Sequence, residues 1–223
     1  DPVTIGAMVG PEAFTEVRYL AHAKQLQALD LLPELAAEFQ QVFGRNSGGL
    51  IKPYQLEDAE TVVIALGSVL GTIKDTVDEM RAQGIKIGVL GITSFRPFPI
   101  EAIRAVTAHA KRIVVIEKCF AVGIGGIVSR DVRSAVQSRP QQVFAVVAGL
   151  GGRAITKASL HKLLLQAIDD KLELLTFLDL DWGIVNRVLE REKQQRRSGP
   201  VAEGILRDIG TVSREAPTLS STA

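Results

Sequence analysis

The feature that most constrains the fold is an alternation of apolar and amphipathic segments between residues 58 and 160. Four short segments are rich in Val and Ile and are typical of strands: "ETVVIALGS", "IKIGVLGI", "RIVVIEK" and "QQVFAVVAGL". The segments between and after them, such as "SVLGTIKDTVDEMRAQG", carry apolar residues at helical spacing. Apolar strands that alternate with amphipathic helices are typical of a parallel sheet covered by helices on both faces. The sequence therefore predicts an α/β fold with a mostly parallel sheet.

Two flanking segments complete a predicted division into three regions. Residues 1–55 form a helical entry segment, residues 56–160 the α/β domain, and residues 161–223 a helical tail. The end of the tail, "TVSREAPTLSSTA", is rich in Ser and Thr, so we expect part of the tail to be disordered.

The entry segment contains "PEAFTEVRYLAHAKQLQALDLLPELAAEFQQVFG", which predicts two helices joined near Asp30 and Pro33. Gly44 follows as a helix stop. The next stretch, "GLIKPYQL", is expected to run extended outside a regular ladder, because Pro53 has no N–H to donate.

The composition bears on partners and location. The formal net charge is +1, so no charge excess points to nucleic acid or to an anionic membrane. The apolar runs are too short and too interrupted by Gly to span a bilayer. The one cysteine, Cys119, permits no internal disulfide, which favours a cytoplasmic location. The chain begins with Asp and shows no signal peptide, so we expect a processed or truncated piece of a longer protein.

Candidate functional residues follow the predicted strands, because ligands of open parallel sheets bind at the carboxyl ends of the strands. After the first strand, Gly67 and Ser68 favour a helix cap over a phosphate site. After the second, "FRPFP" places Phe95, Arg96 and Phe98 on a loop that proline stiffens. These residue types are enriched in interfaces, although the two rings are equally compatible with a local core cap.

The loops after the third and fourth strands contain a cysteine and several glycines. Cys119 and Phe120 precede a glycine-rich approach to a helix. A helix N-terminus can activate a thiol, but a small buried cysteine is the favoured interpretation, since no histidine is placed beside it. Arg153 follows "AGLGG", where either a phosphate or a partner surface would suit it. Thr156, three residues further on, is a good cap for the next helix.

Three motifs in order carry a family resemblance: "GSVLGTIKDTVDEMR", "FRPFP" and "GLGGRAIT". Together with "VVIEKCFAVGIGGIVSRDVRSAV", they resemble the alpha subunit of 2-oxoacid:ferredoxin oxidoreductases, in the transketolase-C-terminal-like region of the pyruvate and phenylglyoxylate oxidoreductase family. The resemblance covers roughly residues 1–157. The long tail that follows departs from the family's short ending, which by the resemblance points to a subclass that acts on bulkier, aromatic 2-oxoacids such as phenylglyoxylate.

The resemblance implies a multi-subunit enzyme. Such enzymes use thiamin diphosphate, Mg, iron–sulfur clusters and coenzyme A to decarboxylate a 2-oxoacid and pass electrons to ferredoxin or another acceptor. The resemblance also implies beta, gamma and ferredoxin-like partner subunits. The sequence shows neither a diphosphate-binding motif nor metal-spaced cysteines, so we predict a structural and assembly role and no cofactor bound by this segment alone.

Two alternatives remain open: the C-terminal domain of a 2-oxoacid dehydrogenase beta chain or transketolase, and a non-catalytic scaffold domain. No catalytic residue is assigned. The tail segment "DWGIVNRVLEREKQQRR" predicts a helix with Trp182 and Leu189 on one narrow apolar stripe. The candidate interface residues are Phe95, Arg96, Phe98, Cys119, Phe120, Arg153, Trp182 and Leu189.

Overall fold

The computed structural model describes residues 8–195 and residue 205. The chain divides into two compact units, Asp1–Leu178 and Asp179–Ala223. The first unit contains a six-stranded sheet whose strands have the order β1-β3-β2-β4-β5-β6. The strands are β1 (Ile51–Tyr54), β2 (Thr61–Ala65), β3 (Ile87–Ile92), β4 (Arg112–Glu117), β5 (Gln142–Val147) and β6 (Leu175–Phe177).

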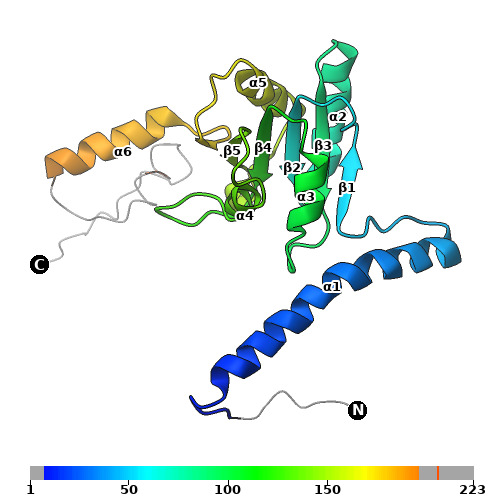
Figure 1. The fold of residues 1–223 in the computed structure, drawn as a ribbon. Helices are drawn as coiled ribbons and strands as arrows, with labels where there is room; N and C mark the ends of the chain where they lie inside the picture. Colours follow the sequence, from blue (N-terminus) through cyan, green and yellow to red (C-terminus); the bar gives the residue numbers. More distant parts are fainter. Residues whose placement is uncertain (1–7, 196–204, 206–223) are drawn as a thin grey trace, which may run out of the picture. The chain divides into compact units, whose positions relative to one another are not determined.

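Five of the six strands run parallel, and β1 pairs antiparallel with β3 at one edge. Helices cover both faces of the sheet (Figure 1). They are α2 (Val69–Ala82), α3 (Ile100–Val106), α4 (Val128–Ala135) and α5 (Lys157–Ile168), with a short 3-10 turn η1 (Leu150–Gly152) before α5. The predicted fold class, a mostly parallel α/β sheet covered on both faces, is confirmed.

The core is divided between the two faces by the alternation of side chains along each strand. On β2, Val63 belongs to the cluster that packs under α2 and α5, whereas Val62 and Ile64 belong to the cluster under α3 and α4. Every residue of β2 is buried. This is why the parallel strands appear in the sequence as continuous apolar runs.

The two outer strands differ from expectation. We expected "GLIKPYQL" to lie outside a regular ladder, but Ile51–Tyr54 is an edge strand in which Pro53 lies opposite Leu90 of β3. An edge strand has one side without a neighbouring strand, so proline can join without costing a ladder hydrogen bond. Strand β6 was expected to belong to a helical tail, but it extends the parallel sheet beyond β5.

The N-terminal helix α1 (Phe14–Phe43) is one element of 30 residues, so the predicted break near Asp30 and Pro33 is wrong. Proline removes one helical hydrogen bond, but strong helix formers such as Leu32 and Ala36 flank it and the helix continues through it. The predicted stop is confirmed: Gly44 adopts a left-handed conformation with φ 66°, and its N–H donates to the carbonyl of Gln40 at 2.8 Å.

The second unit contains α6 (Trp182–Gln195), as the tail pattern predicts. The N–H of Ile184 donates to Asp181 Oδ1 at 3.1 Å, so this aspartate caps the first turn. Arg196, Arg197 and the expected disordered end lie outside the described residues.

Candidate functional site

A cavity of about 570 Å³ opens at the carboxyl ends of the parallel strands. Its walls come from the loops that follow β2, β3, β4 and β5, the same loops that the sequence singles out. The lining residues are Leu66, Gly67, Ser68, Val69, Thr72, Phe95, Ile116, Glu117, Lys118, Cys119, Val128, Ala148, Gly149, Gly152, Arg153 and Ile155. The cavity therefore collects the predicted loop residues Phe95, Cys119 and Arg153 in one place.

The sheet topology explains why the cavity forms here. Strands β2 and β4 are neighbours, but the helices that follow them lie on opposite faces of the sheet. The loops after two such strands diverge and leave a crevice between them, which is where open α/β sheets usually bind ligands.

The centre of this edge is organised by Glu117, the last residue of β4, which is 5% exposed. Its carboxylate accepts three backbone hydrogen bonds at the start of α4: from Ile127 at 2.8 Å, Val128 at 2.7 Å and Ser129 at 2.9 Å. Free N–H groups at a helix N-terminus attract anions. Here the chain supplies that anion itself, so a phosphate would have to displace Glu117 to reach these three donors.

A close approach at Gly126 makes this arrangement possible. A Cβ atom on residue 126 would overlap the carboxylate of Glu117 and crowd the hydroxyl of Ser129. Sequence reasoning missed Glu117, because a single acidic residue after an apolar run resembles an ordinary strand end. The signal that could have found it is the Gly-Gly pair directly before the next helix.

The "FRPFP" loop is fixed to its own domain. Phe95 and Phe98 are half-buried against the cluster under α3 and α4, and their rings form an edge-to-face pair with centroids 6.3 Å apart. The Arg96 guanidinium lies 4.1 Å from the Phe95 ring centroid and donates to Asp131 of α4 at 2.8 Å. Arg96 therefore has an acidic partner within its own domain, and both rings pack against the local core.

The structure corrects one prediction in the following loop. Cys119 is exposed, not buried, because it lies in the loop beyond the end of β4, where its neighbour Lys118 is exposed as well. Phe120 turns back instead, and its ring forms an edge-to-face pair with Phe177 of β6 at 5.0 Å between centroids. Phe120 thus ties this loop to the edge of the sheet.

The two predicted helix caps differ in outcome. Ser68 occupies the cap position before α2, but its hydroxyl makes no capping hydrogen bond there. Thr156 caps α5 as expected, since its hydroxyl oxygen accepts from the N–H of Ser159 at 3.1 Å. Arg153, between Gly152 and this cap, is exposed and lines the cavity.

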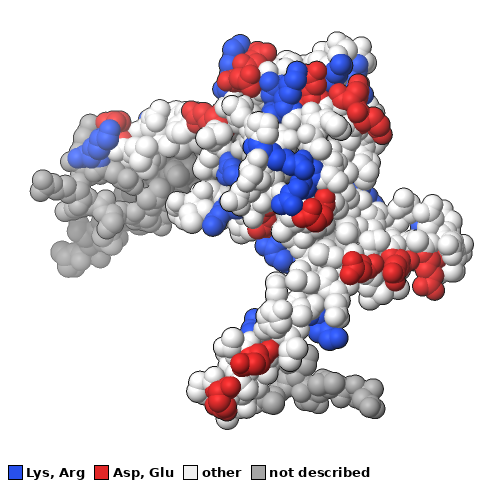
Figure 2. Space-filling view, in the orientation of Figure 1, with Lys and Arg blue, Asp and Glu red and all other residues white. Residues whose placement is uncertain are grey.

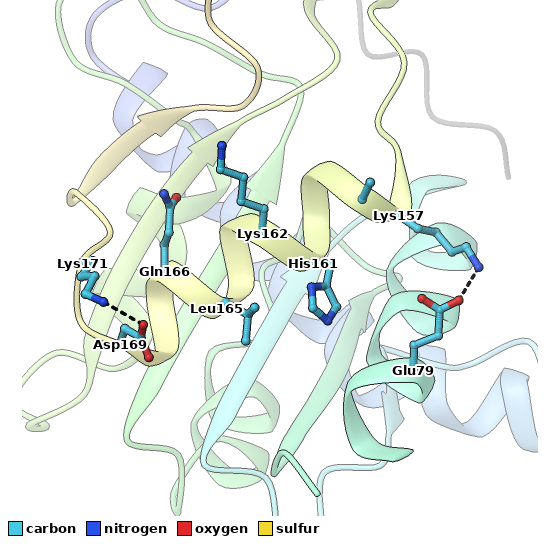
Figure 3. A pocket seen from close by; sticks show the side chains of 9 residues that line it. Glu79, Lys157, His161, Lys162, Leu165, Gln166, Asp169 and Lys171 are labelled. Atoms are coloured by element: carbon cyan, nitrogen blue, oxygen red, sulfur yellow. Dashed lines mark hydrogen bonds and ion pairs between the residues drawn. The ribbon is translucent and has the colours of Figure 1, made fainter. Parts of the chain in front are cut away.

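A second hollow, of about 780 Å³, lies along the outer surface of α5 (Figure 3). Most of its charged side chains form ion pairs with each other: Lys157 with Glu79 of α2, and Lys171 with Asp169 at 3.0 Å. In Figure 3 Lys162 points away from the side of the helix on which His161 lies. Without convergent polar groups, this surface lacks the features of a binding site.

The ion pairs that shift pKa values lie away from the cavity. At the amino end of β2, a hydrogen bond from Arg81 lowers the pKa of Asp58, and one from Lys111 lowers the pKa of Glu60. Beside α5, a hydrogen bond to Glu79 raises the pKa of Lys157. Figure 2 shows Lys and Arg gathered in the middle of one face with acidic side chains beside them.

The second unit presents the two predicted tail residues to solvent. Trp182 is 59% exposed and Leu189 is 49% exposed on α6.

Within the described part of the chain, no group of three or more His, Cys, Asp or Glu side chains could hold a metal ion. None of the helices in this part combines the length and apolar content needed to cross a membrane.

Comparisons with known proteins show what this chain is similar to. Residues 59–160 match the family model of the pyruvate:ferredoxin oxidoreductase core domain II. The chain is 42% identical to pyruvate synthase subunit PorA of Methanosarcina barkeri, over 74% of this chain and 42% of that protein. It is 33% identical to ketoisovalerate oxidoreductase subunit VorA of Pyrococcus horikoshii, over 70% of this chain and 40% of that protein.

A solved 2-oxoglutarate:ferredoxin oxidoreductase from Magnetococcus marinus aligns with a TM-score of 0.43 and 18% identity, over 61% of this chain and 21% of that one. The chain spans about two fifths of the length of the curated relatives it matches.

The first unit is an α/β domain built on a mostly parallel sheet, with its candidate site at the carboxyl edge. Residues 59–160 match the pyruvate:ferredoxin oxidoreductase core domain II, and the chain is similar to the PorA and VorA subunits of its curated relatives. The resemblance that the three motifs predict is confirmed.

Proposed function

We propose that this chain is part of the alpha subunit of a thiamin-diphosphate-dependent 2-oxoacid:acceptor oxidoreductase. Such an enzyme decarboxylates a 2-oxoacid oxidatively to an acyl-CoA and passes the electrons to ferredoxin or another acceptor. The observation that carries the proposal is the match of residues 59–160 to core domain II, supported by the relatives named as oxidoreductase subunits.

Within that enzyme, we assign this segment a structural and assembly role. The described residues do not fit the family's cofactors. Cys119 is the only thiol in the chain, whereas an iron–sulfur cluster is held by several cysteines. The carboxylate of Glu117, at the centre of the cavity, is already occupied by three backbone N–H groups. Thiamin diphosphate, Mg and the clusters would therefore be held by other domains or subunits of a cytoplasmic complex.

The proposed contacts with those subunits come from two places. The exposed edge of the "FRPFP" loop offers Arg96, whose guanidinium side chain is still 52% exposed beside two half-buried rings. An arginine side chain that already lies on an aromatic ring and is held by an internal ion pair loses little conformational entropy when a partner binds it. On α6, Trp182 and Leu189 offer apolar surface that the helix does not use internally.

The test is reconstitution. The chain is expressed with the remaining domains and subunits of the oxidoreductase encoded in its own genome, with and without residues 1–195. Complexes are then assayed for 2-oxoacid-dependent and coenzyme-A-dependent reduction of a viologen dye. We expect assembly and dye reduction only when the segment is present. A fully assembled and active complex that lacks the segment would contradict the proposal.

A further inference from the structure

The cavity at the carboxyl edge has apolar walls that come from both cores of the first unit. Val69 and Ile155 are partly buried and pack at the border of the cluster under α2 and α5. Leu66 and Phe95 have the same position relative to the cluster under α3 and α4. The cavity therefore lies where the two cores reach the surface, and an apolar group that enters it would contact side chains of both.

The charged side chains around the cavity leave a positive balance. Three charged residues line it: Glu117, Lys118 and Arg153. The carboxylate of Glu117 already accepts three N–H groups at the start of α4, which stabilise its negative charge. Lys118 and Arg153 are exposed and come from the loops after the neighbouring strands β4 and β5. Two cations beside one carboxylate that is already hydrogen-bonded favour an anionic ligand.

Two glycines leave room at the cavity. Gly67 after β2 and Gly152 after β5 both line it, and a Cβ atom on either would meet no heavy atom within 4 Å. Their φ values of 76° and 83° lie in the left-handed region, which glycine adopts without strain. These loops thus place bare backbone where a side chain would otherwise project, which suits close approach of a ligand.

Two of the cavity walls are held in place by contacts within the domain. Phe95 packs edge-to-face on Phe98, and the Arg96 guanidinium that lies on its ring donates to Asp131 at 2.8 Å. Ile155 directly precedes Thr156, whose hydroxyl caps α5. A site whose walls are fixed beforehand loses little conformational entropy when a ligand binds.

We propose that this cavity binds an organic monocarboxylate with a compact apolar body. The apolar body lies against the side chains of the two cores, and the carboxylate pairs with Arg153 and Lys118. A guanidinium suits this anion, because it can donate two parallel hydrogen bonds to one carboxylate. A phosphate group fits less well, because the N–H groups at the start of α4 that would bind it are engaged by Glu117.

This binding site goes beyond the structural role proposed above and does not depend on it, because all of its residues belong to one chain. The chain alone can therefore be tested.

The test is a titration of the purified, ¹⁵N-labelled chain with phenylacetate, followed through the backbone amide signals in NMR spectra. Phenylacetate combines a phenyl ring with one carboxylate, whereas phenylacetamide keeps the ring without the charge and acetate keeps the charge without the ring. We expect saturable shifts at Gly67, Phe95 and Cys119, with a dissociation constant on the order of 1 mM. We expect phenylacetamide and acetate each to bind about tenfold more weakly.

Variants locate the anion within the cavity. Arg153→Met removes one cation and keeps a long side chain, and we expect it to weaken phenylacetate binding about tenfold. Lys118→Met is a second variant for which we expect weaker binding as well. Arg130→Met is the matched control, because Arg130 is an exposed arginine on α4 that does not line this cavity. Circular dichroism verifies that all three variants fold.

Several results would overturn the binding site: no saturable binding of phenylacetate, equally tight binding of phenylacetamide, or an equal loss of affinity in Arg130→Met and Arg153→Met. Shifts confined to the hollow along α5, around Lys162, would overturn it too. Failure of the proposed function can be told apart from these results. A chain that binds phenylacetate but does not assemble with the oxidoreductase subunits refutes the proposed function alone, whereas a chain that assembles but does not bind phenylacetate refutes the binding site alone.

Discussion

Replacement of Glu117 tests the physical account of the carboxyl edge most sharply. Its carboxylate accepts three N–H groups, and two of these donors belong to the buried residues Val128 and Ser129. A buried donor left without a partner costs about 1–3 kcal/mol. Glu117→Ala removes the acceptor from all three donors, so we expect the free energy of unfolding to fall by about 3–5 kcal/mol.

Glu117→Gln distinguishes the hydrogen bonds from simple packing. The amide oxygen can still accept from Ile127 and Val128, which share Oε2, but the NH₂ group then faces the N–H of Ser129. We expect a loss of about 1–3 kcal/mol, smaller than for Ala, because one donor is unpaired and the anion at the helix start is gone.

The assay is urea denaturation of the chain, followed by circular dichroism and fitted for midpoint and slope. Glu101→Gln is the control, since Glu101 is exposed and pairs only with Arg104 on the helix surface. We expect that control within about 0.5 kcal/mol of wild type. If Glu117→Ala also falls within that margin, the carboxylate does not organise this edge and the reasoning is wrong.

Three further expectations follow from particular contacts. The hydrogen bond from Arg81 holds the pKa of Asp58 below its usual 3.8, so this pair stabilises the fold above that pH and loses its effect as the pH falls through the lowered pKa. In the Arg81→Met variant, an NMR titration should find the pKa of Asp58 closer to 3.8, and an unchanged pKa would argue against the pair. Phe98→Ala is expected to weaken assembly with partner subunits in native mass spectrometry, beyond any effect of a Phe98→Leu control that keeps an apolar side chain; identical assembly of both variants would leave Phe98 with a local role only. Backbone amides of α6 around Trp182 and Leu189 are expected to exchange quickly with deuterium in the purified chain and slowly in the complex, and equal protection in both would rule out docking of this helix.

The parallel strands could be predicted from sequence because both of their faces are buried. Residues such as Val62, Val63 and Ile64 must all be apolar when helices cover each side of β2, and that requirement is visible without a structure. The outer strands carry no such signal. Strands β1 and β6 are short and none of their residues is fully buried, so their sequences show no continuous apolar run, and Pro53 is tolerated because β1 is an edge strand.

The location of the candidate site could be predicted from the sequence, but the role of Glu117 and the exposure of Cys119 could not. The carboxyl-end rule and the glycine-rich loops located the cavity, and they placed Phe95, Cys119 and Arg153 at it. The role of Glu117 depends on contacts between residues ten to twelve positions apart, and the Gly-Gly pair before α4 is their one local trace in the sequence. The exposure of Cys119 depends in the same way on the direction of a turn, so a rule based on residue type gave the wrong burial.

We propose that this segment belongs to a thiamin-diphosphate enzyme without itself holding the cofactor. Titration calorimetry of thiamin diphosphate with Mg²⁺ tests it directly, first into the purified chain and then into the complex assembled with its partner subunits. We expect no binding heat from the chain alone and saturable binding by the complex, because we propose that the convergent polar groups that a buried cofactor needs lie on other domains or subunits. Micromolar binding by the chain alone, or an assembled complex that takes up no thiamin diphosphate, would contradict it.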